Sequence, residues 1–181
     1  MPNKALRRLV EGGMIAAIYL ALTLLSRFLG IADGAIQFRL SEALTILPVF
    51  TPAAVPGLTI GCFFANLGSP YGIVDILSGT LATLFAAMLT RCLRHIQYKE
   101  IPFLAPLPPI ITNGLIVGIV VTIMNEAGAL IPANFTFAAF IACAVSVAVG
   151  ELAVCVGLGL PFMIALKKSG ACAHIFPSKT I

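Results

Sequence analysis

Acidic side chains are few in this sequence, and most lie in or beside its apolar segments. The chain has seven Asp and Glu residues among 181. Five of them lie outside the basic clusters: Asp33, Glu42, Asp75, Glu126 and Glu151. A carboxylate at the centre of a membrane helix costs roughly 2.5–3.5 kcal/mol on insertion, so it normally faces a partner or a water-filled cavity. The pattern therefore predicts a polar pocket that opens outward.

Three charged residues have competing interpretations, whereas Glu151 favours ligand binding. Glu151 has about ten apolar-rich residues on each side, which neither solvent nor helix capping explains. Arg39 and Glu42 are three residues apart, so they could form an ion pair on one helix face, and Glu42 would still have lone pairs for a ligand. Asp75 either binds a ligand or stabilises a helix start through the helix dipole.

Neutral polar groups extend the candidate set. Asn66 and Asn113 could bind a ligand or form hydrogen bonds between helices, and such bonds are modest in energy within membranes. Tyr71 could stack on a flat ligand, although an aromatic residue near the interface is more typical of the aromatic belt.

The composition indicates the class of protein that must position these groups. With 60% apolar and 10% charged residues, the chain cannot cover a soluble globule with polar side chains. The net charge of +4 resides in short basic clusters between apolar runs, which argues against a nucleic-acid partner. The sequence shows no metal-binding cluster, nucleophile elbow or phosphate loop. Binding or transport, without a cofactor or metal, is therefore favoured over an enzyme.

The apolar segments predict an all-α polytopic membrane protein, a compact bundle of six transmembrane helices in one domain spanning 1–181. The expected helices cover about 9–29, 38–50, 53–66, 73–93, 107–126 and 137–166. The second and third share only 29 residues, 38–66, so they must be short, tilted or sheltered by their neighbours. A turn at Thr51–Pro52 places nine of the eleven basic residues on one side, so both termini are expected in the cytoplasm of a cell-membrane protein.

Four ordered segments carry a resemblance to a known family. "IQFRLSEALTILPVFTPAAVPGLTIGCFFANL", "DILSGTLATLFAAMLT", "PLPPIITNGLIVG" and "VGELAVCVGLGLPF" resemble the QueT family. These proteins are queuosine-precursor substrate-binding subunits (S components) of energy-coupling-factor transporters. The resemblance implies capture of a substrate from outside, with a transmembrane coupling subunit and two ATPase subunits as partners. It also implies that Ala17 and Ala21, which match an Ala-x-x-x-Ala motif on the first helix, contact the coupling subunit.

The substrate implied by the resemblance is a 7-deazaguanine, such as 7-aminomethyl-7-deazaguanine or queuine. A carboxylate can accept the N–H and amino group of its guanine-like edge together. We expect Glu151 or Glu42 at that edge and Asp75 or the other Glu at the cationic amine. The ligand carbonyl is expected at Asn66, Asn113 or Gln37.

Other functions fit the same residues. A stand-alone carrier could use Glu151 for proton coupling, although no inverted repeat is obvious in 181 residues. An S component for another vitamin-like ligand is a second alternative, and a membrane-embedded enzyme or scaffold is a third.

Overall fold

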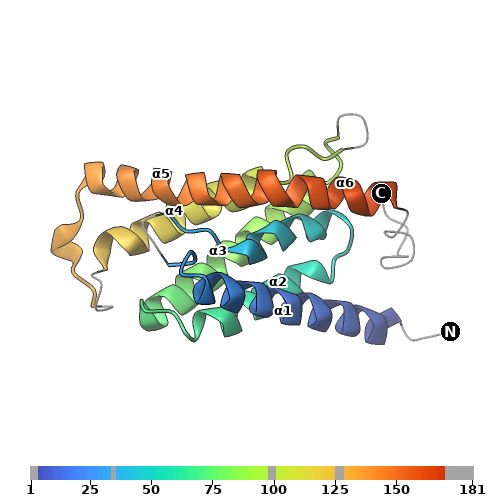
Figure 1. The fold of residues 1–181 in the computed structure, drawn as a ribbon, viewed down its shortest axis with the longest axis horizontal. Coiled ribbons are helices and arrows are strands. Elements are labelled where there is room, and N and C mark those ends of the chain that lie inside the picture. Colours follow the sequence, from blue (N-terminus) through green and yellow to red (C-terminus); the bar gives the residue numbers. More distant parts are fainter. Residues whose placement is uncertain (1–3, 34–35, 98–100, 125–128, 170–181) are drawn as a thin grey trace.

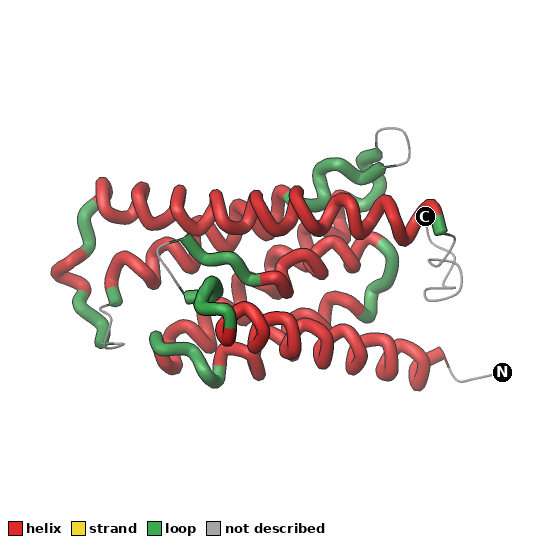
Figure 2. The backbone as a smooth tube through the Cα atoms, viewed as in Figure 1, coloured by secondary structure: helices red, strands yellow, loops and turns green. Residues whose placement is uncertain are grey.

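The described part of the chain is built from helices and contains no strand (Figures 1 and 2). The computed structural model describes residues 4–33, 36–97, 101–124 and 129–169. The elements in chain order are α1 (Lys4–Phe28), η1 (Leu40–Val49), α2 (Ala54–Asn66), α3 (Gly72–Leu93), α4 (Leu107–Ile123), η2 (Pro132–Asn134), α5 (Phe137–Val154), η3 (Cys155–Gly159) and α6 (Leu160–Lys168). The predicted all-α class is confirmed. The end of the fifth predicted helix, with Glu126, lies outside the described residues.

Three of the described helices are long and apolar enough to cross a membrane. They are Lys4–Phe28, Gly72–Leu93 and the continuous run Phe137–Lys168. The other principal helices are apolar but shorter. At about 2.0 Å per residue for a 3₁₀-helix and about 1.5 Å for an α-helix, η1 and α2 each extend roughly 20 Å. A bilayer core is about 30 Å thick, so both fall short of it.

Successive long segments run in opposite directions along the bundle (Figure 1). The start of α1 and the end of α6 lie at the same end of the molecule (Figure 1). Two contacts bring the η1–α2 turn to this end: Thr51 Oγ1 donates to Glu11 Oε2 at 2.9 Å, and Arg91 Nη1 donates to the Pro48 carbonyl at 2.9 Å. An even number of crossings, as the basic clusters predict, would place these two ends on one side of a membrane, and that number stays a prediction. Which end faces the cytoplasm stays a prediction.

The segment η1 lies at the centre of the bundle. It contacts α1, α2, α3, α5, α6 and η3. We expected a regular helix from Phe38, whereas the structure has a 3₁₀-helix that begins at Leu40 and contains Pro48. Ten residues is long for this conformation, whose runs seldom exceed three or four residues. The hydrogen bonds of a 3₁₀-helix are weak, so η1 depends on packing against these six elements for its stability.

Small residues allow the surrounding helices to approach closely. A Cβ added at Gly57 would lie 2.7 Å from the Gly12 carbonyl, and one at Gly118 would lie 2.8 Å from Ala144 Cα. Glycine therefore sets the α1–α2 and α4–α5 spacing, as is typical of membrane helix interfaces. At the other end of α1, Gly30 adopts a φ of 71°. The Ile31 N–H bonds to the Ser26 carbonyl at 3.0 Å, which ends the helix in a Schellman motif.

The last long helix is interrupted by one π-helical turn. η3 (Cys155–Gly159) joins α5 to α6 without a break in the chain direction (Figure 1). Its Gly159 packs against η1, where an added Cβ would lie 3.4 Å from the Ala43 carbonyl. Such π turns occur frequently at functional sites.

Candidate functional site

Glu42 of η1 and Glu151 of α5 lie close together in the interior. Cys155 Sγ lies 3.5 Å from both the Glu42 carbonyl and Glu151 Oε2, and 3.7 Å from Thr45 Oγ1. The side chains of Glu42 and Glu151 are only 2% and 7% exposed, and their carboxyl groups interact electrostatically. Within the described residues, neither has a basic group within ion-pair distance. We call Glu42 and Glu151 the carboxylate pair.

The carboxylate pair is held mainly by neutral donors. Asn113 Nδ2 donates to Glu151 Oε1 at 2.6 Å, and the Tyr19 hydroxyl donates to Glu42 Oε1. The bond from Asn113 is possible because Gly114 and Gly118 let α4 lie directly against α5. This bond joins two helices, as considered for Asn113 from the sequence. It also places the Asn113 amide beside the Glu151 carboxyl group.

A second acidic group surrounds Arg39. Arg39 Nη2 lies 3.7 Å from both Asp33 Oδ1 and Asp75 Oδ2, and Ser69 Oγ donates to Asp75 Oδ2 at 2.5 Å. We call Arg39, Asp33 and Asp75 the arginine cluster. Arg27 Nε extends it with a bond to Asp33 Oδ2 at 3.0 Å.

The predicted Arg39–Glu42 ion pair is wrong for the described structure. Arg39 has an extended backbone, φ −96° and ψ 105°, at the residue before η1. It therefore does not share a helical face with Glu42, and its side chain turns toward the aspartates instead. Arg39 acts on both members of the carboxylate pair only as a longer-range charge.

Two glycines leave room for Asn66 and Gln37: Gly79 beside Asn66, and Gly150 beside Gln37. Asn66 Nδ2 lies 3.4 Å from the Asp75 carbonyl, and a Cβ at Gly79 would lie 2.5 Å from that amide nitrogen. A Cβ at Gly150 would overlap the Gln37 carbonyl. The segment before η1 therefore rests against α5 next to Glu151.

Five of the predicted site residues have buried polar atoms that find no hydrogen-bond partner within the described residues. These atoms are Gln37 Nε2, Arg39 Nε, Arg39 Nη2, Glu42 Oε2, Asn66 Oδ1 and Asp75 Oδ1. Native proteins leave few such groups unsatisfied, because each costs about 1–3 kcal/mol. The set contains both donors and acceptors, so it matches a ligand that has both.

The remaining predicted residue, Tyr71, lies half-buried at the residue before α3, where its N–H donates to Ser69 Oγ at 3.2 Å. Sequence reasoning missed Tyr19 and Cys155, which both contact the carboxylate pair. A signal for Tyr19 was present: Tyr19, Thr23 and Ser26 recur at helical spacing on one face of α1. Cys155 gave no comparable signal among the scattered cysteines.

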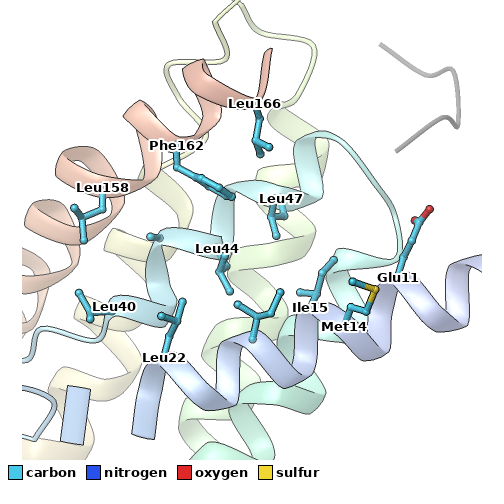
Figure 3. Close-up of a pocket in the computed structure, with 12 residues that line it drawn as sticks. Glu11, Met14, Ile15, Leu22, Leu40, Leu44, Leu47, Leu158, Phe162 and Leu166 are labelled. Atoms are coloured by element: carbon cyan, nitrogen blue, oxygen red, sulfur yellow. The ribbon is translucent and has the colours of Figure 1, made fainter. Parts of the chain in front are cut away.

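A hollow of about 840 Å³ has no residue of the carboxylate pair or the arginine cluster in its lining; Figure 3 shows the residues that line it. Its walls are formed by residues of α1, η1, η3 and α6: Glu11, Met14, Ile15, Ile18, Leu22, Leu40, Ala43, Leu44, Leu47, Leu158, Phe162 and Leu166. We call it the apolar groove. Because Glu42, Asp75 and Glu151 do not line it, it is not the polar pocket that the acids predict. That pocket stays a prediction, and the structure has these acids buried in two groups, the carboxylate pair and the arginine cluster.

The outer face of α1 has small residues beside this groove. Gly13, Ala17 and Ala21 are exposed, and nothing lies within 4 Å of a Cβ added at Gly13. The adjacent inward stripe, with Gly12, is the one that packs against α2. In the described residues, no group of three His, Cys, Asp or Glu side chains could hold a metal ion.

Comparison with known proteins identifies the family. The model of the QueT transporter family matches residues 9–168. The chain belongs to the QueT transporter family. As a member of a transporter family it is not an enzyme, in agreement with its sequence, and its apolar helices are those of a membrane protein.

One curated relative is the queuosine precursor transporter QueT of Lactococcus lactis subsp. cremoris (strain MG1363), which is 37% identical over 76 residues. The alignment covers 42% of this QueT-family chain and 44% of the relative, so the chain spans less than half the length of that protein. No solved structure matches the chain.

Proposed function

We propose that this protein is a multi-pass substrate-binding subunit of an energy-coupling-factor importer in the cell membrane, and that it captures a 7-deazaguanine queuosine precursor from outside. The unpaired buried polar atoms of Gln37, Arg39, Glu42, Asn66 and Asp75 carry the proposal. A flat base with donors and an acceptor on its edge would satisfy them. The family match and the name of the Lactococcus relative support the same substrate class.

The charges favour one orientation of the ligand. Asp75 already faces Arg39, whereas the carboxylate pair lacks a close basic partner. The cationic aminomethyl group therefore belongs at Glu42 Oε2, with Glu151 beside it. The N–H and amino groups of the base suit the adjacent acceptors Asp75 Oδ1 and Asn66 Oδ1, and the carbonyl suits the Gln37 amide or Arg39.

The direct test is the mass of any small molecule that stays bound to protein purified in detergent. The expected mass is that of a 7-deazaguanine. Titration of ligand-free protein with 7-aminomethyl-7-deazaguanine should give saturable binding. Saturable binding of an unrelated vitamin, with none of the deazaguanine, would establish an S component for another ligand.

The coupling subunit is proposed to dock on α1. The apolar groove and the exposed face with Ala17 and Ala21 together offer a smooth apolar surface that fits a transmembrane helix of that subunit. Ala17→Leu and Ala21→Leu are expected to reduce co-purification with the coupling and ATPase subunits and to leave ligand binding intact. Ala142→Leu, at an exposed position of α5 and not on α1, is the matched control for added bulk. Unchanged assembly of both alanine variants would exclude this surface.

The adjacent acids also favour a second candidate, a stand-alone proton-coupled carrier. Paired buried carboxylates are typical of proton relays in transporters. Uptake into vesicles that contain this protein alone, driven by a pH gradient without ATP, would support it. Uptake that requires ATP and the partner subunits would support the importer.

A further inference from the structure

Three side chains on one face of α1 form hydrogen bonds with three consecutive residues of η1. They pair Ser26 Oγ with the Leu40 N–H at 2.9 Å, Thr23 Oγ1 with Ser41 Oγ at 2.8 Å, and the Tyr19 hydroxyl with Glu42 Oε1. We call these three bonds the α1–η1 seam. The seam matters because η1 has weak internal hydrogen bonding, so its register depends on bonds to its neighbours.

Tyr19 forms the charged bond of the seam. Its side chain is 1% exposed, and its hydroxyl donates to one oxygen of Glu42, while the other oxygen, Oε2, is buried without a partner. A bond to an ionised carboxylate is roughly twice as strong as a neutral one. The bond therefore fixes the rotation of the carboxyl group and decides where Oε2 points.

The Tyr19 side chain is itself held in place by packing. A Cβ at Gly61 would lie 2.9 Å from Tyr19 Cβ, so α2 passes directly over the base of the side chain. Thr23 Oγ1 also bonds to the Tyr19 carbonyl at 3.0 Å. Because the ring is confined in this way, the Tyr19 hydroxyl donates from a fixed position.

We propose that Tyr19 is a positioning residue that orients Glu42, so that Glu42 Oε2 faces the cationic amine of the ligand. This inference rests on the proposed function and deepens it, because it assigns recognition of the aminomethyl group to Glu42 and its orientation to α1. Tyr19 does not need to touch the ligand. Its effect should therefore depend on whether the ligand has the amine.

The test measures dissociation constants for 7-aminomethyl-7-deazaguanine and for 7-deazaguanine without the aminomethyl group. Tyr19→Phe keeps the ring and removes the donor. We expect it to weaken binding of the amine about tenfold and of the unsubstituted base less than about twofold. The readout is the ratio of the dissociation constant of the unsubstituted base to that of the amine, which should therefore fall. Thr59→Val, which removes a hydroxyl that bonds to the Val55 carbonyl within α2 and lies outside the seam, is the control and should leave this ratio unchanged.

A second variant tests the same inference by a different route. Glu42→Asp keeps the charge but shortens the side chain away from the Tyr19 hydroxyl, so it should lower the same ratio. Combining it with Tyr19→Phe should lower the ratio no further, because both changes break one bond. A ratio that falls in both single variants and not in Thr59→Val supports the proposal.

Three results would overturn it, and they are distinguishable. Equal weakening of both compounds by Tyr19→Phe would show a general structural role. Unchanged binding of both would show that Glu42 needs no orientation. If the unmodified protein binds neither compound, the proposed function fails, and the role of Tyr19 fails with it.

Discussion

The arginine cluster and the carboxylate pair are both acidic and buried, but their partners differ in kind. In the arginine cluster, the two aspartates face a guanidinium at 3.7 Å, so charge is largely balanced within the protein. In the carboxylate pair, the donors are a phenol, an amide and a thiol, and the described residues supply no close cation. A buried charge needs a partner, so the pair is the place where a ligand has most to contribute.

The difference predicts that the arginine cluster mainly affects folding and the carboxylate pair mainly affects ligand affinity. A balanced internal ion pair mainly determines whether the region folds, because removing one member leaves an uncompensated buried charge. A carboxylate pair held by neutral groups contributes less to folding and more to affinity for a cation. Four predictions test this distinction.

The largest effect is expected on stability, from Arg39→Met. It leaves the buried Asp75 without its cation, while Asp33 keeps Arg27, and should lower the free energy of unfolding by about 3 kcal/mol, measured by thermal or denaturant unfolding in detergent. Arg7→Met, which breaks the exposed pair with Glu11, is the control and should cost less than about 1 kcal/mol. Adding Asp75→Asn to Arg39→Met should recover part of the loss; no recovery would contradict the balanced-charge account.

The next effect is expected on ligand affinity. Glu42→Gln and Glu151→Gln each replace an acid of the carboxylate pair by an amide with little change of shape, and each should weaken binding of 7-aminomethyl-7-deazaguanine about 100-fold. Isothermal titration in detergent measures this. Glu11→Gln, at the edge of the apolar groove, is the matched control and should bind normally. Normal binding by both pair variants would remove these acids from the site.

A smaller loss is expected when Asn66 is displaced without changing any charge. In Gly79→Ala the new methyl group would lie 2.5 Å from the Asn66 amide nitrogen, so the amide must move. We expect about tenfold weaker binding of the deazaguanine base, with or without the aminomethyl group. Gly13→Ala adds a methyl group where nothing lies within 4 Å and should bind normally. If Gly79→Ala weakens only the amine-bearing compound, Asn66 belongs with the carboxylate pair instead.

The smallest effect is expected from Ser69→Ala. It removes the donor at 2.5 Å from Asp75 Oδ2 but keeps the ion pair with Arg39. Affinity should fall about two- to fivefold, since one neutral donor contributes about 0.5–1 kcal/mol. Ser78→Ala, whose hydroxyl bonds only to a backbone carbonyl of its own helix, is the control for the titration. A loss larger than that of Glu42→Gln would reverse the proposed ranking of the two regions.

The sequence predicted the helical class and the gathering of polar residues for a physical reason. Acids are so costly in an apolar segment that their positions predict a shared interior site; Glu42, Asp75 and Glu151 are all buried in the structure, and the shared site stays a prediction. That Arg39 would turn to Asp33 and Asp75 was not predictable from spacing, because the extended backbone at Arg39 depends on tertiary packing. The 3₁₀ form of η1 depends on it too, since six surrounding elements stabilise it.

The π turn of η3 also affects which way the last helix faces. One extra residue in a turn rotates everything after it by about 100° relative to an uninterrupted α-helix. Upstream of the turn, Glu151 is directed into the protein interior; downstream, Leu158 and Phe162 line the apolar groove. Deleting a single residue between 155 and 159 would restore a regular helix at the expense of one of these two orientations. One continuous helix thus turns an acidic side chain inward along its first part and apolar side chains toward the groove along its last part, because its hydrogen bonding shifts by one residue between them.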